Sequence, residues 1–338
     1  MRTPTFSQAF EVLCLQAADR GRGNVLFGES FQRARAAGQP FMVGEDFPDV
    51  YLEFPLTGDP FLDITVLLGA LPPNTRIESP TAQGTEAMLD WYAGIRPQHT
   101  EVSCGYEIDT KKSDFGQAAV HFQPRMHTEL VEPFCNIVGE PERARLYLEL
   151  SERMPEGWPL SFFGMFRGRP GSPLRVCGYM GFEQKDTCAN NPSCLQDAFD
   201  AIGFTSYDAM MLEQVSELLA AAPGSVDFQF DLYDDGTLGS TFAIDVQFAV
   251  ERPELVQSSF TDGPASHVMK LLEQWGAADE RWHLGIQATF AQAIPVELED
   301  GSMGRYAFTL MPQWVKARWT DATLQPSKLY HLGSAGLL

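Results

Sequence analysis

Positive charge, paired cysteines and long apolar runs are scarce in this sequence of 338 residues. Lysine and arginine number 24 against 45 aspartates and glutamates, which gives a formal net charge of −21. The average field of such a chain repels phosphate-bearing surfaces, which argues against nucleic acid and anionic membranes as partners but leaves room for a local basic site. No stretch approaches the roughly 18 uninterrupted apolar residues of a membrane-spanning helix, so no membrane insertion is expected.

The six cysteines are scattered without a Cys-x-x-Cys pair, and residues 1–5 lead into a helix-like segment without a signal-peptide core. We therefore predict a soluble, cytoplasmic protein. In that reducing compartment the cysteines are expected to be free thiols. Cys188 and Cys194 flank a turn-rich segment, where a disulfide or a metal site is the lesser alternative.

Common catalytic signatures are also missing. The chain has no Gly-x-Gly-x-x-Gly after a strand, no phosphate loop ending in Gly-Lys-Ser/Thr and no Gly-x-Ser-x-Gly. No two of its six histidines have the i, i+4 spacing of a helical zinc site. Evidence for the function must therefore come from the predicted fold and from the residues on its predicted strand faces.

The sequence does contain a repeated order of elements. Helical periodicity is followed by two alternating segments, about five times along the chain. Helices are predicted at 6–17 and 29–37, 79–95, 127–153, around 211–219 and around 268–275. The predicted strand pairs are 50–55 with 62–68, 101–109 with 117–123, 160–167 with 174–180, 226–233 with 241–249, and 282–290 with 305–310. Residues 314–319 and 328–331 are predicted as further extended segments.

Antiparallel strand pairs with one helix each can form an open layer or a closed barrel. Closure removes exposed sheet edges, so we predict an α+β fold with a closed ten-stranded antiparallel barrel ringed by helices. Although the length would allow two domains, the repeat favours a single αββ-repeat barrel domain over 1–338. The alternative is a half-solvated antiparallel sheet.

Strand alternation separates an apolar face from a polar one. Phe228 and Phe230 share a face of residues 226–233, and Asp227 and Gln229 share the other. Since the apolar faces should pack on the helices, the polar faces should line a wet lumen suited to a small ligand. The predicted lumen and substrate-facing residues are Glu107, His121, Gln229, Asp231, Asp245, His283 and Gln287.

The αββ order resembles that of the ABBA, or prenyltransferase-barrel, family over most of the chain. Segments 104–110 (CGYEIDT) and 118–122 (AAVHF) resemble the second hairpin of the cyanobactin peptide prenyltransferases, and 282–286 (WHLGI) resembles the start of their last hairpin. The resemblance implies transfer of a prenyl group from an isoprenoid diphosphate to an aromatic small molecule or peptide side chain inside the barrel.

This chemistry requires basic and tyrosine groups around the diphosphate, aromatic walls for the allylic cation and a carboxylate near the acceptor. Glu53 is the first choice for that carboxylate and Asp63 the second. The candidate diphosphate ligands are Arg167, Arg175, Tyr179, Tyr233, Arg305 and Lys316, with Arg318 as a further basic candidate.

The predicted lumen departs from that pattern because it is rich in carboxylates, whereas residues 226–233 and 241–249 contain no lysine or arginine. Mg²⁺ could bridge carboxylates to diphosphate, or the acidic side could lie away from the donor. The alternative function is a non-catalytic barrel that binds a cationic peptide or amine. Convergence of four or more basic and tyrosine groups at one end of the lumen would favour the transferase.

Overall fold

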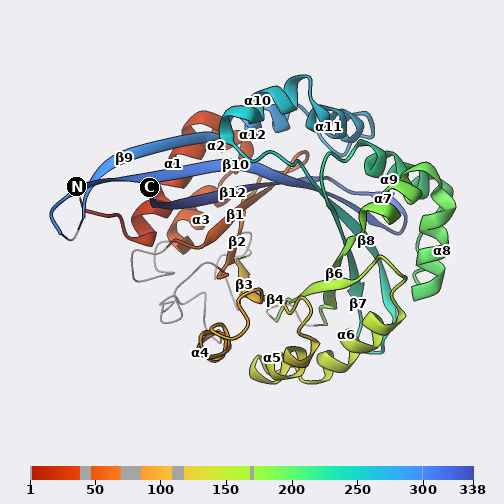
Figure 1. The fold of residues 1–338 in the computed structure, drawn as a ribbon. Helices are drawn as coiled ribbons and strands as arrows, with labels where there is room; N and C mark the ends of the chain where they lie inside the picture. Colours follow the sequence, from red (N-terminus) through yellow and green to blue (C-terminus); the bar gives the residue numbers. More distant parts are fainter. Residues whose placement is uncertain (1, 39–46, 70–84, 109–117, 168–170, 299) are drawn as a thin grey trace.

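The ribbon of the computed structural model, which describes residues 2–38, 47–69, 85–108, 118–167, 171–298 and 300–338, is a closed barrel (Figure 1). Ten antiparallel strands form the ring in the order β10-β12-β1-β2-β3-β4-β5-β6-β7-β8, and β8 pairs back to β10. The predicted ten-stranded α+β barrel is thus confirmed.

Four predicted hairpins are observed. In each, apolar and polar residues alternate with the period of two that is typical of strands. They are β1 (Asp49–Pro55) with β2 (Asp63–Leu67), β3 (Ser103–Ile108) with β4 (Ala119–Gln123), β5 (Leu160–Met165) with β6 (Leu174–Met180), and β7 (Val226–Leu232) with β8 (Leu238–Gln247). The predicted loops over 110–116 and 168–170, and the helix start at 79–80, lie outside the described residues.

The fifth predicted hairpin is wrong. Residues 282–287 belong to the helix α12 (Arg281–Gln287), whose buried Trp282, Gly285 and Ile286 lie on one helical face. The fifth strand pair of the barrel is instead β10 (Met303–Thr320) with β12 (Lys328–Leu337). The strand β9 (Phe290–Glu297) pairs with the first part of β10 outside the ring, and the short β11 (Thr323–Leu324) pairs with its end.

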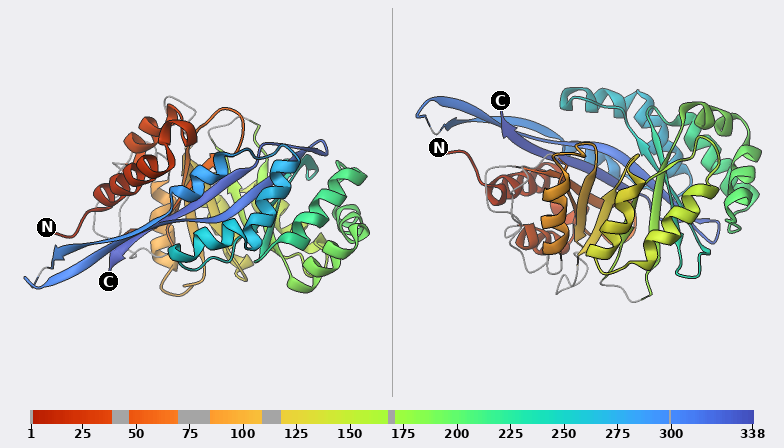
Figure 2. Two further views of the ribbon diagram at one scale, coloured as in Figure 1. Left: turned by 90° about the horizontal axis from the view of Figure 1, so that it is seen from above. Right: turned by 60° about the horizontal axis from the view of Figure 1, so that its bottom comes forward.

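Helices cover the outer wall of the barrel, as two further views show (Figure 2). They follow the predicted order, with one group before each strand pair. The groups are α1 (Phe6–Gly21), α2 (Gly23–Leu26) and α3 (Ser30–Gly38); α4 (Glu86–Ile95); η2 (Thr128–Leu130), α5 (Val131–Ile137) and α6 (Glu142–Arg153); α7 (Phe182–Asn190), α8 (Pro192–Ile202) and α9 (Ala209–Ala221); and α10 (Pro253–Thr261), α11 (Pro264–Gln274) and α12.

The main hydrophobic core lies between the helices and the outer wall. On one side of it, Phe199 of α8 and Phe204 contact Phe230 of β7 and Phe242 of β8. All four side chains are buried. The apolar face of each strand therefore serves the core, which leaves the polar face of the same strand for the lumen.

The expectation of six free thiols is wrong for one pair. Cys188 of α7 and Cys194 of α8 form a disulfide, with their Cα atoms 5.0 Å apart. Asn191 ends α7 in an extended conformation and caps α8 through its side chain, and Pro192 occupies the first turn of α8. This tight corner folds α8 back and brings the two cysteines together. The other four cysteines are free and buried.

Among the described residues, none of the helices combines the length and the apolar character that crossing a bilayer would require.

Candidate functional site

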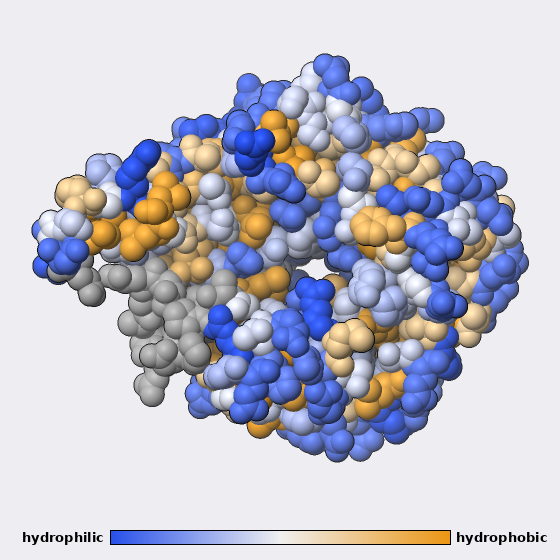
Figure 3. Space-filling model, viewed as in Figure 1, coloured by the Kyte–Doolittle hydropathy of each residue, from blue (hydrophilic) through white to orange (hydrophobic). Residues whose placement is uncertain are grey.

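A cavity of about 2210 Å³ occupies the lumen, and each of the ten ring strands contributes to its wall. The space-filling view shows an opening near the middle of the molecule, surrounded mostly by hydrophilic residues (Figure 3). In β7, Asp227 and Gln229 line the cavity, while Phe228 and Phe230 belong to the core. The alternation of each strand therefore produces the polar lumen that it predicts.

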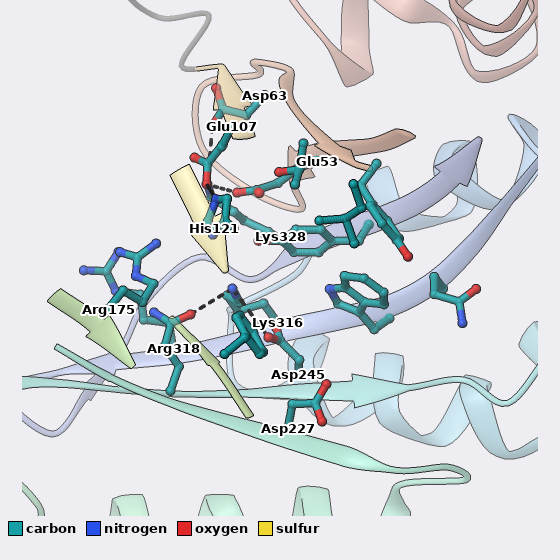
Figure 4. A pocket seen from close by; sticks show the side chains of 18 of the residues that line it. Glu53, Asp63, Glu107, His121, Arg175, Asp227, Asp245, Lys316, Arg318 and Lys328 are labelled. Atoms are coloured by element: carbon teal, nitrogen blue, oxygen red, sulfur yellow. Dashed lines mark hydrogen bonds and ion pairs between the residues drawn. The ribbon is translucent and has the colours of Figure 1, made fainter. Parts of the chain in front are cut away.

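Basic side chains converge in this cavity (Figure 4). Arg175 of β6, Lys316 and Arg318 of β10, and Lys328 of β12 all line its wall. Lys316 and Lys328 are register partners on neighbouring strands, and Lys316 Nζ lies 5.2 Å from the ring centre of Tyr330. These four cations and Tyr330 thus line one lumen.

Lys328 sits between the two carboxylates predicted to act on the acceptor. Its Nζ forms an ion pair with Glu53 and lies 3.6 Å from Asp63 Oδ2. Burial opposes the charge of Lys328, but Glu53, Asp63 and Glu107 outweigh it and raise the lysine pKa. Glu53 is opposite Asp63 on β2 and opposite Tyr330 on β12, which explains why these groups meet.

A second ionic group crosses from β3 to β7. His121 Nε2 lies 3.5 Å from Glu107 Oε2, and Arg175 Nε lies 3.5 Å from Asp231 Oδ1. Burial tends to raise the pKa of Glu107, but His121, Arg175 and Lys328 outweigh it and bring this pKa to about 2. Glu107 is therefore a permanent anion at neutral pH.

Lys316 faces a third acidic group, on β7 and β8. Its Nζ lies 3.5 Å from Asp245 Oδ2 and donates a hydrogen bond of 3.0 Å to Gln229 Oε1. Asp245 Oδ1 is buried and has no hydrogen-bond partner among the described residues. Burial, and then the nearby Asp245, raise the pKa of Asp227 to about 6.

Aromatic rings form one wall of the cavity. Tyr51 and Trp314 have their ring centres 4.6 Å apart, and Trp314 stacks on Tyr330 with ring centres 5.3 Å apart. Because Lys316 lies over the Tyr330 ring, the aromatic wall adjoins the basic cluster. Such faces can stabilise a carbocation beside a bound anion.

Most residues expected in the lumen or around the diphosphate are placed near one another. Those that line the cavity are Glu53, Asp63, Glu107, His121, Arg175, Tyr179, Gln229, Asp245 and Lys316. Tyr179 is 43% exposed. Asp231 does not line the cavity itself but pairs with Arg175.

Five expected residues lie elsewhere. His283 and Gln287 belong to α12, so their placement in the lumen is wrong. Arg305 is opposite Pro295 of β9, in the part of β10 that extends beyond the barrel. Arg167 follows the end of β5, where the strand alternation no longer holds, and Tyr233 is 44% exposed in the β7–β8 turn. None of the five lines the lumen cavity.

Lys328, Tyr330, Tyr51 and Trp314 belong to the site without having been expected there. The signal for three of them is the two-residue alternation at 314–319 and 328–331. Trp314, Lys316 and Arg318 share one face of the first segment, Lys328 and Tyr330 share one face of the second, and both faces line the lumen. These segments join the ring through pairings with β8 and β1, far away in the sequence.

No protein-family model and no curated protein sequence matches this chain. Solved structures do match it. 5-Dimethylallyltryptophan synthase from Streptomyces coelicolor aligns with a TM-score of 0.51 at 13% identity, covering 98% of both chains. The same enzyme has been solved in complex with DMASPP and Trp, and that structure also aligns with a TM-score of 0.51.

Two further solved structures align over similar lengths. AnaPT from Neosartorya fischeri has a TM-score of 0.52 at 9% identity, covering 98% of this chain and 95% of its own. The prenyltransferase PriB has a TM-score of 0.50 at 11% identity, covering 98% and 96%. With its closed ring of ten strands and its outer helices, this chain has the ABBA, or prenyltransferase-barrel, fold.

Proposed function

We propose that this protein transfers a prenyl group from an isoprenoid diphosphate to an aromatic acceptor, a small molecule or a peptide side chain, inside the barrel. The observation that carries the proposal is the convergence of Arg175, Lys316, Arg318, Lys328 and Tyr330 in one lumen beside an aromatic wall. The solved structures of the same fold, which include a dimethylallyltryptophan synthase, agree with this chemistry.

The basic cluster would act on the donor. As the C–O bond of the allylic diphosphate breaks, negative charge grows on the departing diphosphate, and Lys316, Arg318 and Arg175 are placed to stabilise it. The allylic carbon keeps the positive charge. The wall of Tyr51, Trp314 and Tyr330 lines the same cavity and would shield that cation from water.

Glu53 would complete the transfer. The aromatic acceptor supplies an electron pair to the allylic cation, a new bond to carbon forms, and the acceptor then loses one proton. Glu53, which is 4% exposed, is a carboxylate in the same cavity that can take this proton. Lys328 orients Glu53 and balances its charge before the donor enters.

The diphosphate must compete with lumen carboxylates for the basic side chains. Lys316 is paired with Asp245 and Lys328 with Glu53, so a diphosphate must replace or share these partners. Asp227 and Asp245 provide oxygen donors, and Asp245 Oδ1 has no other partner among the described residues, which fits the hard ligand preference of Mg²⁺. Asp227 and Asp245 would hold the ion, which would supply positive charge to offset the charge of the diphosphate.

Donor binding and transfer can be tested separately. Dimethylallyl, geranyl and farnesyl diphosphate, each with and without Mg²⁺, are added while thermal unfolding is followed, and products with indole or tyrosine acceptors are sought by mass spectrometry. At least one donor should raise the melting temperature. Lys316→Met should abolish that rise, whereas Glu53→Gln should keep it and lower product formation at least 100-fold.

Arg305→Met is the matched control for Lys316→Met, because Arg305 lies on the same strand but outside the cavity. It should behave like the wild type in both assays. Absence of any thermal shift with all three donors would contradict the proposal, and so would a shift that Lys316→Met leaves intact.

A second candidate function, binding of a cationic peptide or amine, is favoured by Asp227 and Asp245. The pKa of Asp227 near 6 distinguishes the two functions. Below pH 6 Asp227 becomes neutral, so in Mg²⁺-free buffer affinity for a diphosphate should rise relative to the Asp227→Asn variant, whereas affinity for a cationic ligand should fall. Calorimetric titrations at pH 5 and pH 7.5, with each ligand type and both proteins, measure this difference.

A further inference from the structure

Two histidines and a glutamate outside the ionic groups of the lumen form a compact cluster of metal-binding side chains. His99 lies in the loop after α4, and His127 and Glu129 lie at the start of η2. One potential ligand atom from each residue lies within 4.8 Å of the other two. The histidine rings meet edge to face with centres 4.5 Å apart. Two loops that are distant in sequence thus present two imidazoles and a carboxylate to one point.

The backbone holds both histidines in place. The His99 amide donates to Ile95 O, and its carbonyl accepts from the Val102 amide. The His127 amide donates to Pro124 O, and its carbonyl accepts from the Leu130 amide. His99 Nδ1 is buried and makes no hydrogen bond among the described residues. A buried ring nitrogen without a partner is costly unless something else satisfies it, and a metal ion can do so.

A second carboxylate completes the pattern around His127. Its Nδ1 lies 2.8 Å from Glu129 Oε1, and its Nε2 contacts Glu101 on the opposite side of the ring. A metal-binding histidine usually gives its other ring N–H to a carboxylate, which fixes the ring and makes the ligand nitrogen more basic. Glu101 is in the position to do this for a His127 that binds metal through Nδ1.

From this arrangement we infer a zinc site formed by His99, His127 and Glu129, with Glu101 orienting His127. Imidazole and carboxylate ligands suit Zn²⁺, whose ligand bonds of about 2.0–2.2 Å place tetrahedral ligands about 3.3 Å apart. The present atoms lie within 4.8 Å of one another, and small shifts of the exposed Glu129 and of the partly buried imidazoles would bring them to that spacing. Three protein ligands leave a fourth position for water or another oxygen ligand.

The site lies at the rim of the lumen. Thr100, Glu101 and Val102, which link His99 to β3, line the cavity wall, so the ion would tie the loop before β3 to the segment after β4. The inference is independent of the prenyl transfer proposed above. A metal bound only to the folded state stabilises it according to its concentration and affinity.

Cobalt is the probe, because Co²⁺ in a zinc site absorbs visible light. The untagged full chain is stripped with a chelator and titrated with Co²⁺, and the visible spectrum and the metal-to-protein ratio are measured. We expect one Co²⁺ per chain, a d–d band typical of tetrahedral nitrogen and oxygen ligation, and its loss when Zn²⁺ is added. Zn²⁺ should also raise the melting temperature of the wild-type protein.

His99→Ala and His127→Ala should each lower the affinity at least 100-fold and remove the thermal effect of Zn²⁺. Glu101→Gln keeps all three ligands and should weaken binding about 10- to 100-fold. His267→Ala, on the exposed face of α11, is the matched control and should bind like the wild type. Circular dichroism of each variant shows whether it folds.

Three results would overturn the inference: no stoichiometric Co²⁺ spectrum, binding that His99→Ala and His127→Ala both retain, or a spectrum with thiolate charge-transfer bands. If His127→Ala fails to fold, His99→Ala and Glu101→Gln still decide the question, because they alter one ligand and one supporting group respectively.

Discussion

His331 is an imidazole buried in the outer core, on the face of β12 away from the lumen. Neither of its ring nitrogens has a hydrogen-bond partner among the described residues, and its ring contacts Phe54 edge to face at 5.2 Å. Burial lowers its pKa from the usual 6.5 to about 3. The folded chain therefore keeps His331 neutral at pH values where the unfolded chain protonates it.

Replacement of His331 by leucine should make folding less sensitive to acid. The depressed pKa contributes stability above about pH 6.5, and this contribution is lost as the pH falls towards 3. Between pH 7 and pH 5 the wild type should lose about 2 kcal/mol from this group alone. In urea unfolding experiments, the free energy of unfolding of His331→Leu minus that of the wild type should increase by that amount from pH 7 to pH 5.

His267→Gln, an exposed substitution, serves as the control, and its difference in free energy of unfolding from the wild type should be the same at pH 7 and pH 5. Equal pH dependence of His331→Leu and the wild type would mean that His331 is charged or hydrogen-bonded in the folded state.

At the scale of single elements, β6 passes very close to its neighbours at Gly178. A Cβ atom there would lie 2.3 Å from Pro159 O and 2.4 Å from Phe228 Cζ. Since a backbone oxygen is one of these atoms, Gly178→Ala should shift β6 and destabilise the fold by about 1–3 kcal/mol. Chemical unfolding measures this loss.

Gly336→Ala is the strand control for that substitution, because nothing lies within 4 Å of the added Cβ atom. It should change stability by less than about 0.5 kcal/mol. Similar losses in both variants would show that strand glycines as such, and not the close approach at Gly178, determine the cost.

Elements with strong local patterns were predictable from the sequence. Alternation in 226–232 identified a strand and also which side of it carries Asp227 and Gln229 into the lumen. The segment 282–287 is too short for its period to separate strand from helix, and a strand was predicted where α12 forms. Lys328 was missed because its role depends on the pairing of β12 with β1, which no local pattern encodes.

At the scale of the whole molecule, the charge of −21 acts against the compact state. Many lumen charges are paired, so the excess of negative charge acts mainly through the surface, where salt screens it. The melting temperature should therefore rise by about 2 °C or more, or roughly 1 kcal/mol, between 10 mM and 300 mM NaCl. Differential scanning calorimetry at pH 7.5 measures the change.

An equal osmolality of sucrose separates charge screening from general solute exclusion, since sucrose carries no charge. A melting temperature that falls with NaCl would show that screened ion pairs contribute more than the repulsion does.

The pairing of β12 with β1 also affects how the chain can be made. During synthesis β1 emerges early, but its partner lies more than two hundred residues later, after every other strand of the ring. Until then one edge of β1 remains open, and the other open edge of the sheet belongs to β8 before β10 emerges and to β10 afterwards; such edges attract other strands. Before β12 emerges, the nascent chain is therefore an open, curved sheet, and the pairing of β12 with β1 and β10 closes that sheet around the lumen.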